Sequence, residues 1–107
     1  MYKAVGIWSW PKDDEVADFE RHYQETHVPL AKELPGVRKI TLLLGGDDAR
    51  EPDIYRIAEV YWDDAEAFAA AAESDAWATM VEDATGMMER WGVTLSSAHA
   101  TEEQVSG

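Results

Sequence analysis

Two histidines and a tyrosine stand within the nine residues HYQETHVPL, residues 22–30, and their side chains can carry proton-transfer chemistry. A histidine ring gains or loses a proton near neutral pH, so His27 suits a general base or acid beside a carbonyl group. Such a proton transfer is common to isomerisation, dehydration and cyclisation. Tyr23 precedes His27 by about one helical turn, and its hydroxyl suits a substrate carbonyl or enolate oxygen. The stretch therefore predicts His27 and Tyr23 as a catalytic pair.

Pro29 interrupts the helical pattern around these side chains. Because proline lacks a backbone N–H and its ring clashes with the carbonyl four residues earlier, we expect distorted backbone with free carbonyl groups near His27. On a helical wheel, His27 lies near the centre of the apolar face and His22 lies towards its rim. A structural interpretation stays open, in which His27 only holds the kink and Tyr23 packs in the core with its hydroxyl reaching water.

The segment YRIAEVYW, residues 55–62, places a carboxylate among apolar side chains. Side chains alternate along a strand, so Glu59 shares a sheet face with Tyr61. Because central strands rarely bury an unpaired acid, Glu59 either pairs with Arg56 or Arg38 at the sheet edge or faces a polar cavity. In the second case Glu59 and Tyr61 are candidate substrate-binding residues.

Five tryptophans in 107 residues are available to pack a core or to line a cavity. Trp77 and Trp91 belong to an apolar helical stripe, which favours core packing. Trp8 and Trp62 come from predicted strands, and we expect them to be the better candidates for the wall of a pocket that binds a flat, apolar ligand. His99 ends the last predicted strand, where exposure to solvent is the simplest expectation.

The charge balance excludes several classes of function. Nine Lys and Arg against 22 Asp and Glu give a formal net charge of −13, with no basic cluster to offset it, so phosphate backbones and anionic membranes would be repelled. The N-terminal run YKAVGIWSW is too short to span a bilayer. The absence of cysteine excludes disulfides and thiolate metal sites and is compatible with a cytoplasmic location.

Neither a metal nor a cofactor is expected from the motifs. His22 and His27 are five residues apart, which matches no recognised spacing of metal ligands. The glycines of LGGDD, residues 44–48, are followed by no predicted helix, so a nucleotide cofactor has no support.

The apolar pattern predicts the element order β-α-β-β-α-β. Strands are expected at residues 2–8, 37–44, 55–62 and 92–100, and a first helical region from about residue 14 to residue 34. A capping box of Asp63 and Glu66 would open an alanine-rich helix to about residue 73, and Ser74 or Asp75 would cap a further helical stretch. This order predicts an α+β, ferredoxin-like fold with a four-stranded antiparallel sheet and helices on one face. It would occupy residues 1–100 as one domain, followed by a polar tail at 101–107.

The predicted strands are apolar on both faces, as in AVGIW and TLLL. Two helices cover only one face of such a sheet, and the chain has no segment left to build another layer. A second copy of the same sheet would cover the other face with two-fold symmetry. We therefore expect a homodimer formed through the sheet.

The segment DFERHYQETHVPLAKELPGVRKI, residues 18–40, resembles the signature of the EthD-like family, which belongs to the dimeric α+β barrel group. The matching features are Phe19, Tyr23, His27, Pro29, Leu30 and the Leu-Pro-Gly at 34–36. Residues 58–87 also resemble the second half of the family, with an acidic turn, an alanine-rich helix and an aspartate, here Asp83. Ile40 departs from the aromatic residue that the family often has there. The resemblance covers about residues 2–99 and implies the dimeric α+β barrel.

The resemblance implies function more broadly, because fold alone does not decide it. Relatives include proteins of ether and aromatic degradation, and lactone isomerases, dehydratases and cyclases that act on polyketide-like substrates. Three classes follow. The first is a cofactor-independent isomerase, dehydratase or cyclase that uses His27 on an aromatic, lactone or polyketide-like substrate in catabolism or secondary metabolism. The second is a cofactor-free monooxygenase, and the third is a non-catalytic dimer that binds a small apolar molecule.

Overall fold

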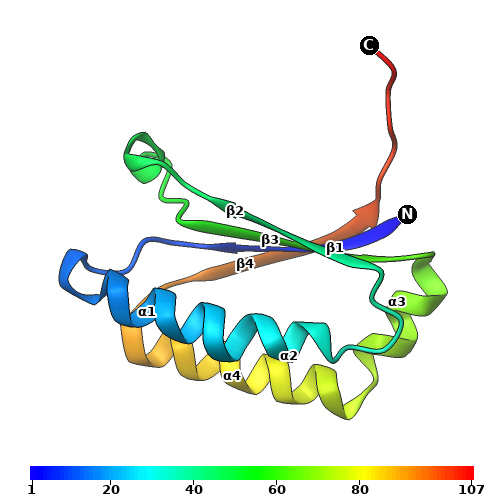
Figure 1. Ribbon diagram of the computed structural model, residues 1–107, viewed down its shortest axis with the longest axis horizontal. Coiled ribbons are helices and arrows are strands. Elements are labelled where there is room, and N and C mark those ends of the chain that lie inside the picture. Colours follow the sequence, from blue (N-terminus) through cyan, green and yellow to red (C-terminus); the bar gives the residue numbers. More distant parts are fainter.

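Four antiparallel strands form one sheet in the order β2-β3-β1-β4 (Figure 1). The computed structural model describes residues 1–107, with the side chain of Ala49 left out. The strands are β1 (Tyr2–Trp8), β2 (Lys39–Leu44), β3 (Arg56–Trp62) and β4 (Leu95–Thr101). The two central strands, β1 and β3, are rich in the β-branched and aromatic residues that fit a pleated, half-buried surface. The predicted α+β, ferredoxin-like fold is confirmed.

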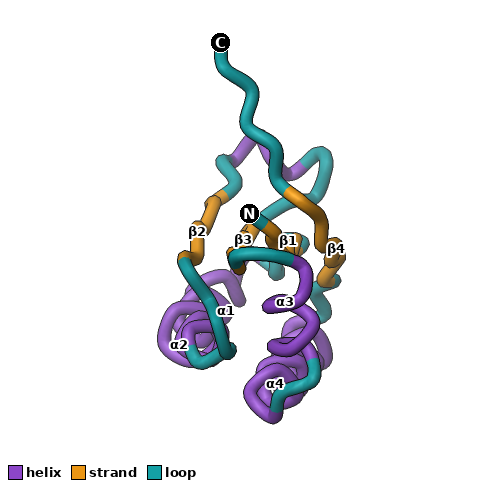
Figure 2. The backbone as a smooth tube through the Cα atoms, turned by 90° about the vertical axis from the view of Figure 1, so that its right-hand side faces the viewer, coloured by secondary structure: helices purple, strands orange, loops and turns teal.

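The main helices lie against one face of the sheet, and the C-terminal tail leaves on the other side (Figures 1 and 2). The first helical region consists of a 3₁₀ turn, α1, a π-helical turn called η2, and α2. The second consists of α3 and α4, and a further 3₁₀ turn, η3, lies between β2 and β3. Their bounds are η1 (Asp13–Glu15), α1 (Val16–His22), η2 (Tyr23–His27), α2 (Val28–Lys32), η3 (Asp47–Arg50), α3 (Ala65–Ala72) and α4 (Asp75–Trp91). No helix in the described chain is long and apolar enough to cross a bilayer.

The distortion expected ahead of Pro29 is a full π-helical turn. The backbone N–H of Val28 donates to the carbonyl of Tyr23, five residues earlier. This wider turn adds one residue to the helical repeat and rotates the face that follows it. Ala31 is therefore buried against the sheet, whereas Leu30, which a regular α-helix would place on the same face as Tyr23, lines an outer groove between α1 and α4.

The second helical region begins one residue later than predicted. The side chain of Asp64, and not that of Asp63, accepts a hydrogen bond from the backbone N–H of Ala67 at 2.8 Å and so caps α3. Asp63 instead accepts two hydrogen bonds from Arg38. Ser74 caps α4. It is one of the two residues, Ser74 and Asp75, that were predicted as the cap.

The core between helices and sheet divides into two clusters of buried side chains. One gathers under α1 and the C-terminal half of α4, and it contains Trp8, Phe19, Tyr23, Tyr55, Ala84, Met87, Trp91 and Val93. The other gathers under α2 and α3, and it contains Ala31, Leu34, Val60, Trp62 and Ala71. Trp8, Phe19, Tyr23 and Trp62 are almost completely buried, so both aromatic strand ends and the first helical region contribute to this core.

The opposite face of the sheet is only partly apolar, which corrects the expectation of strands apolar on both faces. Strand register and alternation place three rows of side chains across this outer face. The rows are Leu43, Ile57 and Ile7; Thr41, Glu59 and Val5; and Lys39, Tyr61 and Lys3. The first row is apolar and the last carries two lysines around a tyrosine. The outer face thus has an apolar end and a charged end.

Candidate active site

A cavity of about 240 Å³ lies between the helices and the sheet. Its floor comes from alternate residues of the strands, and its walls come from η2, α2 and α4. Most of the lining is apolar, and the polar groups that reach it are few. The strand residues include Ala4, Gly6, Trp8, Ile40, Leu42, Ala58, Val60, Trp62, Leu95 and Ser97; the helical ones include Tyr23, His27, Ala31, Trp77, Met80, Val81, Ala84 and Thr85.

The cavity opens between α4 and the edge strand β4. Val81 and Thr85 of α4 and Ser97 of β4 line the cavity and are also exposed to solvent. Of the lining residues from η2, Tyr23 is completely buried and the side chain of His27 is 12% exposed. A ligand that entered at this opening would meet two hydroxyls first and the histidine and tyrosine at depth.

The His27 ring is oriented by a carboxylate from α4. Its Nδ1 lies 2.9 Å from Oδ2 of Asp83, and because a carboxylate only accepts hydrogen bonds, Nδ1 carries the proton. Trp8 and the His27 ring form a T-shaped pair at 5.5 Å between centroids, and Tyr23 is stacked on the His27 ring at 6.1 Å. This arrangement leaves Nε2 as the nitrogen that can take a proton from a ligand in the cavity.

Burial lowers the pKa of His27 below its ordinary value of 6.5, although the hydrogen bond to Asp83 acts in the opposite direction. The ring is therefore neutral at neutral pH and keeps a basic lone pair. A neutral imidazole on the wall of an apolar cavity has the protonation state that a general base requires.

Tyr23 supplies a hydrogen-bond donor beside this base. Burial raises the pKa of Tyr23 to about 12, so the phenol keeps its proton. Its hydroxyl is buried and has no hydrogen-bond partner among the residues that the structure describes. A buried, unpaired hydroxyl costs free energy, which a ligand with an acceptor oxygen would recover.

Asp83 also binds a second histidine. The Nε2 of His22 lies 2.9 and 3.0 Å from the two carboxylate oxygens of Asp83. His22 ends α1, and His27 ends the π-helical turn, so both rings approach the same aspartate from one side of the helix. The site thus consists of a histidine in the cavity, a carboxylate, and a second histidine nearer the surface.

The chain matches the model of the EthD domain over residues 15–90. It belongs to the EthD family. It is 29% identical, over 100 residues, to an uncharacterized 11.0 kDa protein in the thcB-thcC intergenic region of Rhodococcus erythropolis, covering 89% of this chain and 90% of that protein. An EthD family protein from Bacillus halodurans has a similar crystal structure, at 30% identity and a TM-score of 0.73, covering 97% of this chain and 99% of that one.

A more distant structural relative shows the same fold. SnoaB, a cofactor-independent oxygenase from Streptomyces nogalater, superposes with a TM-score of 0.66 at 22% identity, and the match covers 97% of this chain and 94% of SnoaB. Together these likenesses establish the ferredoxin-like fold of this EthD family member.

Among the residues predicted for the site, those from β1, η2 and the end of β3 come together. His27, Tyr23, Trp8 and Trp62 all line the cavity. The Trp62 indole N–H donates to the carbonyl of Pro35 at 2.8 Å, which fixes its ring as part of the wall. Trp77 also lines the cavity, although its place in an apolar helical stripe favoured core packing.

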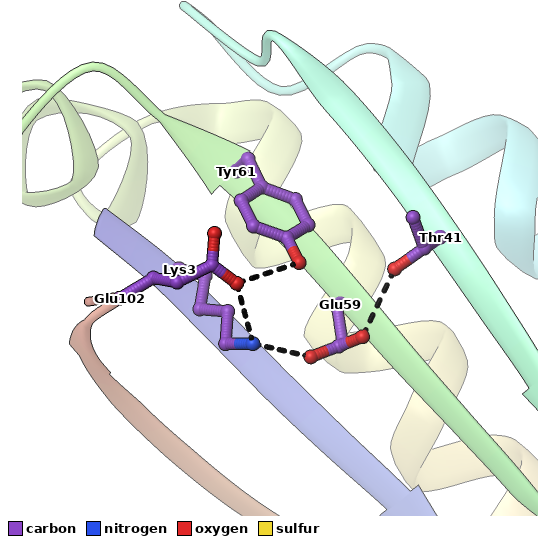
Figure 3. Close-up of polar contacts among 5 residues, drawn as sticks. All are labelled: Lys3, Thr41, Glu59, Tyr61 and Glu102. Carbon is purple, nitrogen blue, oxygen red and sulfur yellow. Dashed lines mark hydrogen bonds and ion pairs between the residues drawn. The ribbon is translucent and has the colours of Figure 1, made fainter. Parts of the chain in front are cut away.

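Glu59 and Tyr61, predicted as substrate-binding residues, lie on the outer face of the sheet, away from the cavity (Figure 3). The ion-pair partner of Glu59 is Lys3, not Arg56 or Arg38, and Thr41 donates to the same carboxylate at 3.1 Å. Strand alternation put Glu59 and Tyr61 on one face correctly, but the pattern did not say which face the helices cover.

The remaining charged and polar candidates have partners elsewhere. Arg56 binds Glu20 of α1. His99 of β4 is hydrogen-bonded to Tyr2 and stacks on Phe68 at 4.6 Å between centroids, and it is exposed to solvent, as expected from its place in the last strand. Within the described part of the chain, no group of three or more potential ligands is arranged to hold a metal ion.

Proposed function

We propose that this EthD family member is a cofactor-independent enzyme that moves a proton next to a carbonyl group, with His27 as the base. The observation that carries the proposal is the pairing of a neutral, oriented imidazole with an unpartnered phenol on the wall of an apolar cavity. Isomerisation, dehydration and cyclisation all begin with this step.

The proposed step is balanced within the site. A C–H bond beside the substrate carbonyl breaks, and its proton goes to Nε2 of His27. The electron pair moves to the carbonyl oxygen, which becomes an enolate and accepts a hydrogen bond from the Tyr23 hydroxyl. Asp83, bonded to Nδ1, stabilises the imidazolium that forms. The proton then returns to a different atom of the substrate or to a leaving hydroxide.

The cavity volume narrows the substrate class. An apolar cavity of about 150 Å³ holds benzene, and sites for drug-sized ligands start at about 300 Å³. A cavity of about 240 Å³ therefore favours a substrate of one or two rings, such as a small aromatic ketone or an unsaturated lactone. Thr85 and Ser97 at the opening suit a polar substituent at the outer end of the molecule.

Deuterium uptake tests this proposal without knowledge of the final product. One- and two-ring lactones and aromatic ketones would be incubated with the protein in D₂O, and exchange beside the carbonyl would be followed by NMR. His27→Ala should slow the exchange by about two to four orders of magnitude. His99→Gln, at a histidine outside the cavity, is the matched control and should exchange like the wild type. Equal exchange in His27→Ala would overturn the proposal.

A second candidate is a cofactor-free monooxygenase. It is favoured by the tryptophans that line the cavity, Trp8, Trp62 and Trp77, which suit an electron-rich phenolic ring, and by the fold shared with SnoaB. Oxygen consumption with phenolic substrates separates the two candidates, since proton transfer alone consumes no oxygen. Saturable ligand binding without exchange or oxygen uptake would instead identify a non-catalytic binding protein.

We further propose that a second copy of the chain covers the outer face of the sheet. Leu43 is 45% exposed on this face, and it continues a row with Ile57 and Ile7 across three strands. Burying that row against its symmetry mate would remove the exposed apolar surface. Light scattering at micromolar concentration should give close to twice the 12.0 kDa mass of one chain, and a monomer would exclude this arrangement.

A further inference from the structure

We propose that His22 is a positioning residue, which holds Asp83 in the orientation that keeps Nε2 of His27 directed at the cavity. This proposal deepens the proposed function of His27 and rests on it for its catalytic meaning. Its test uses the resting protein without substrate, so that the positioning role and the catalytic role can fail separately.

The three side chains share one carboxylate in a way that restricts its rotation. Asp83 accepts from Nδ1 of His27 on Oδ2 alone, and from Nε2 of His22 on both oxygens, at distances of 2.9 to 3.0 Å. Turning the carboxylate about its own axis would break at least one of these bonds. The side chain of Asp83 is 17% exposed, so without His22 it has access to water and to other rotamers.

The π-helical turn is what makes this sharing possible. Residues five apart on a regular α-helix are separated by about 140° around the axis, so two such side chains cannot approach the same aspartate. In a π-helix the hydrogen bonds run between residues five apart, which brings such side chains onto one side. The turn lies at Tyr23–His27 and begins directly after His22. A local change in the helix thus assembles the pair of histidines on Asp83.

The surroundings of His22 suit a supporting residue rather than a reacting one. Its ring packs on Trp91 at 5.5 Å between centroids, and its side chain is 26% exposed. It lines the outer groove between α1 and α4, whose other charged groups are Glu82, Asp83 and Arg90. His22 is absent from the cavity lining, so it reaches a bound substrate only through Asp83 and His27.

If Asp83 turns away, His27 loses the partner of its Nδ1–H. The proton can then occupy either nitrogen, and a ring protonated at Nε2 presents a donor to the cavity in place of a lone pair. We expect His22→Phe to have this effect while keeping the contact with Trp91. His22→Gln should keep His27 protonated at Nδ1, as in the wild type, because the glutamine amide occupies the place of Nε2 and donates to Asp83.

The state of His27 can be read directly by NMR, since the chain has only three histidines. Long-range ¹H–¹⁵N spectra of the rings distinguish a protonated nitrogen from an unprotonated one. At pH 7.5 the wild type and His22→Gln should show His27 protonated at Nδ1 alone, and His22→Phe should show a substantial share protonated at Nε2. His22→Asn, whose shorter amide falls short of Asp83, gives the same comparison if His22→Phe does not fold.

Two further variants calibrate this measurement. Asp83→Asn places an amide beside Nδ1 that can donate to it, so His27 should switch to protonation at Nε2. His99→Gln should leave the His27 signals unchanged. A folded His22→Phe or His22→Asn protein with His27 still protonated at Nδ1 alone would overturn the positioning role. If the tautomer changes as expected while His27→Ala retains deuterium exchange, the positioning role is supported and the proposed function is the one that fails.

Discussion

The polar groups in the cavity on the helix side and those on the outer face of the sheet differ in whether they have hydrogen-bond partners. On the helix side, the Tyr23 hydroxyl is buried without a partner and His27 keeps one nitrogen for the cavity. On the outer side, Lys3 binds both Glu59 and Glu102, and the hydroxyls of Thr41 and Tyr61 donate to these two carboxylates (Figure 3). The cavity on the helix side thus keeps polar atoms without partners, whereas the network on the outer face pairs its polar atoms with one another.

This contrast separates groups for chemistry from groups for structure. A closed network has little to gain from a ligand, because each of its charges already has a partner. An open hydroxyl in an apolar cavity is costly until something binds it. The charged cluster is the more conspicuous of the two by residue type, yet the cavity with one histidine and one phenol is the better candidate for a reaction.

Among the variants that test this contrast between the cavity and the outer face, Tyr23→Phe should have the largest effect. The change removes an unpaired hydroxyl, so the melting temperature should stay the same or rise slightly. Deuterium exchange in the substrate should slow by about 10² to 10³, because the enolate oxygen loses its donor. A large loss of stability with normal exchange would mean that the hydroxyl serves the fold.

Tyr61→Phe is the matched control on the outer face. It removes a hydroxyl that donates to Glu102 at 3.2 Å, far from the cavity lining. We expect exchange within about twofold of the wild type, as for other changes that touch neither substrate nor base. If Tyr61→Phe slowed exchange as much as Tyr23→Phe, the assignment of chemistry to one face would be wrong.

Much of the fold and part of the site were predictable from the sequence, because both depend on local pattern. The alternating and helical periods gave the element order, and Pro29 gave the distorted turn next to His27. The register of the turn was not predictable, since a wheel assumes 100° per residue and the π-helical turn does not follow it. That difference explains why Ala31 replaces Leu30 on the buried face and why the two histidines share one partner.

The predictions from sequence that were wrong or missing concern contacts between residues that are distant in the sequence. Nothing local to Glu59 indicates that Lys3, 56 residues away, lies beside it on the neighbouring strand. Asp83 stands within an apolar helical stripe, between Met80 and Met87, which could have marked it as a polar group facing inward. Its role as the shared acceptor of two histidines required the packing of α4 against η2.

An intermediate effect is expected on the outer face from Lys3→Met. The change leaves Glu59 and Glu102 without their shared cation. If a second copy covers this face, both carboxylates become buried and unpaired in the dimer, so the dissociation constant should rise at least about tenfold. Sedimentation at a series of concentrations measures this. Exchange per folded chain should not change, because the cavity lining is untouched.

The control for Lys3→Met is Arg38→Met, which breaks an ion pair with Asp63 whose side chains are more than half exposed. Exposed pairs contribute little, so the dissociation constant should remain that of the wild type. Equal weakening by the two variants would point to net charge, and not to the outer-face network, as the cause. That result would remove the structural role assigned to the closed face.

The smallest expected effect is a difference in the pH at which each face loses its contribution to stability. Burial lowers the pKa of His27 below its ordinary 6.5, so the unfolded chain takes up this proton first, and stability should begin to fall as the pH drops below about 6.5. The hydrogen bond from Lys3 lowers the pKa of Glu59 below its ordinary 4.5. Its contribution is present above that pH and is lost only as the pH falls through the lower value in the folded protein.

Melting temperatures measured from pH 7.5 to pH 3, as differences from the wild type, isolate each contribution from the many other carboxylates. In His27→Gln, the fall in melting temperature that begins near pH 6.5 should be absent, and the fall at lower pH should remain. Lys3→Met should do the reverse, because Glu59 then lacks the cation that lowers its pKa. If the melting temperatures of both variants depended on pH as that of the wild type does, the pKa shifts assigned here to His27 and Glu59 would be wrong.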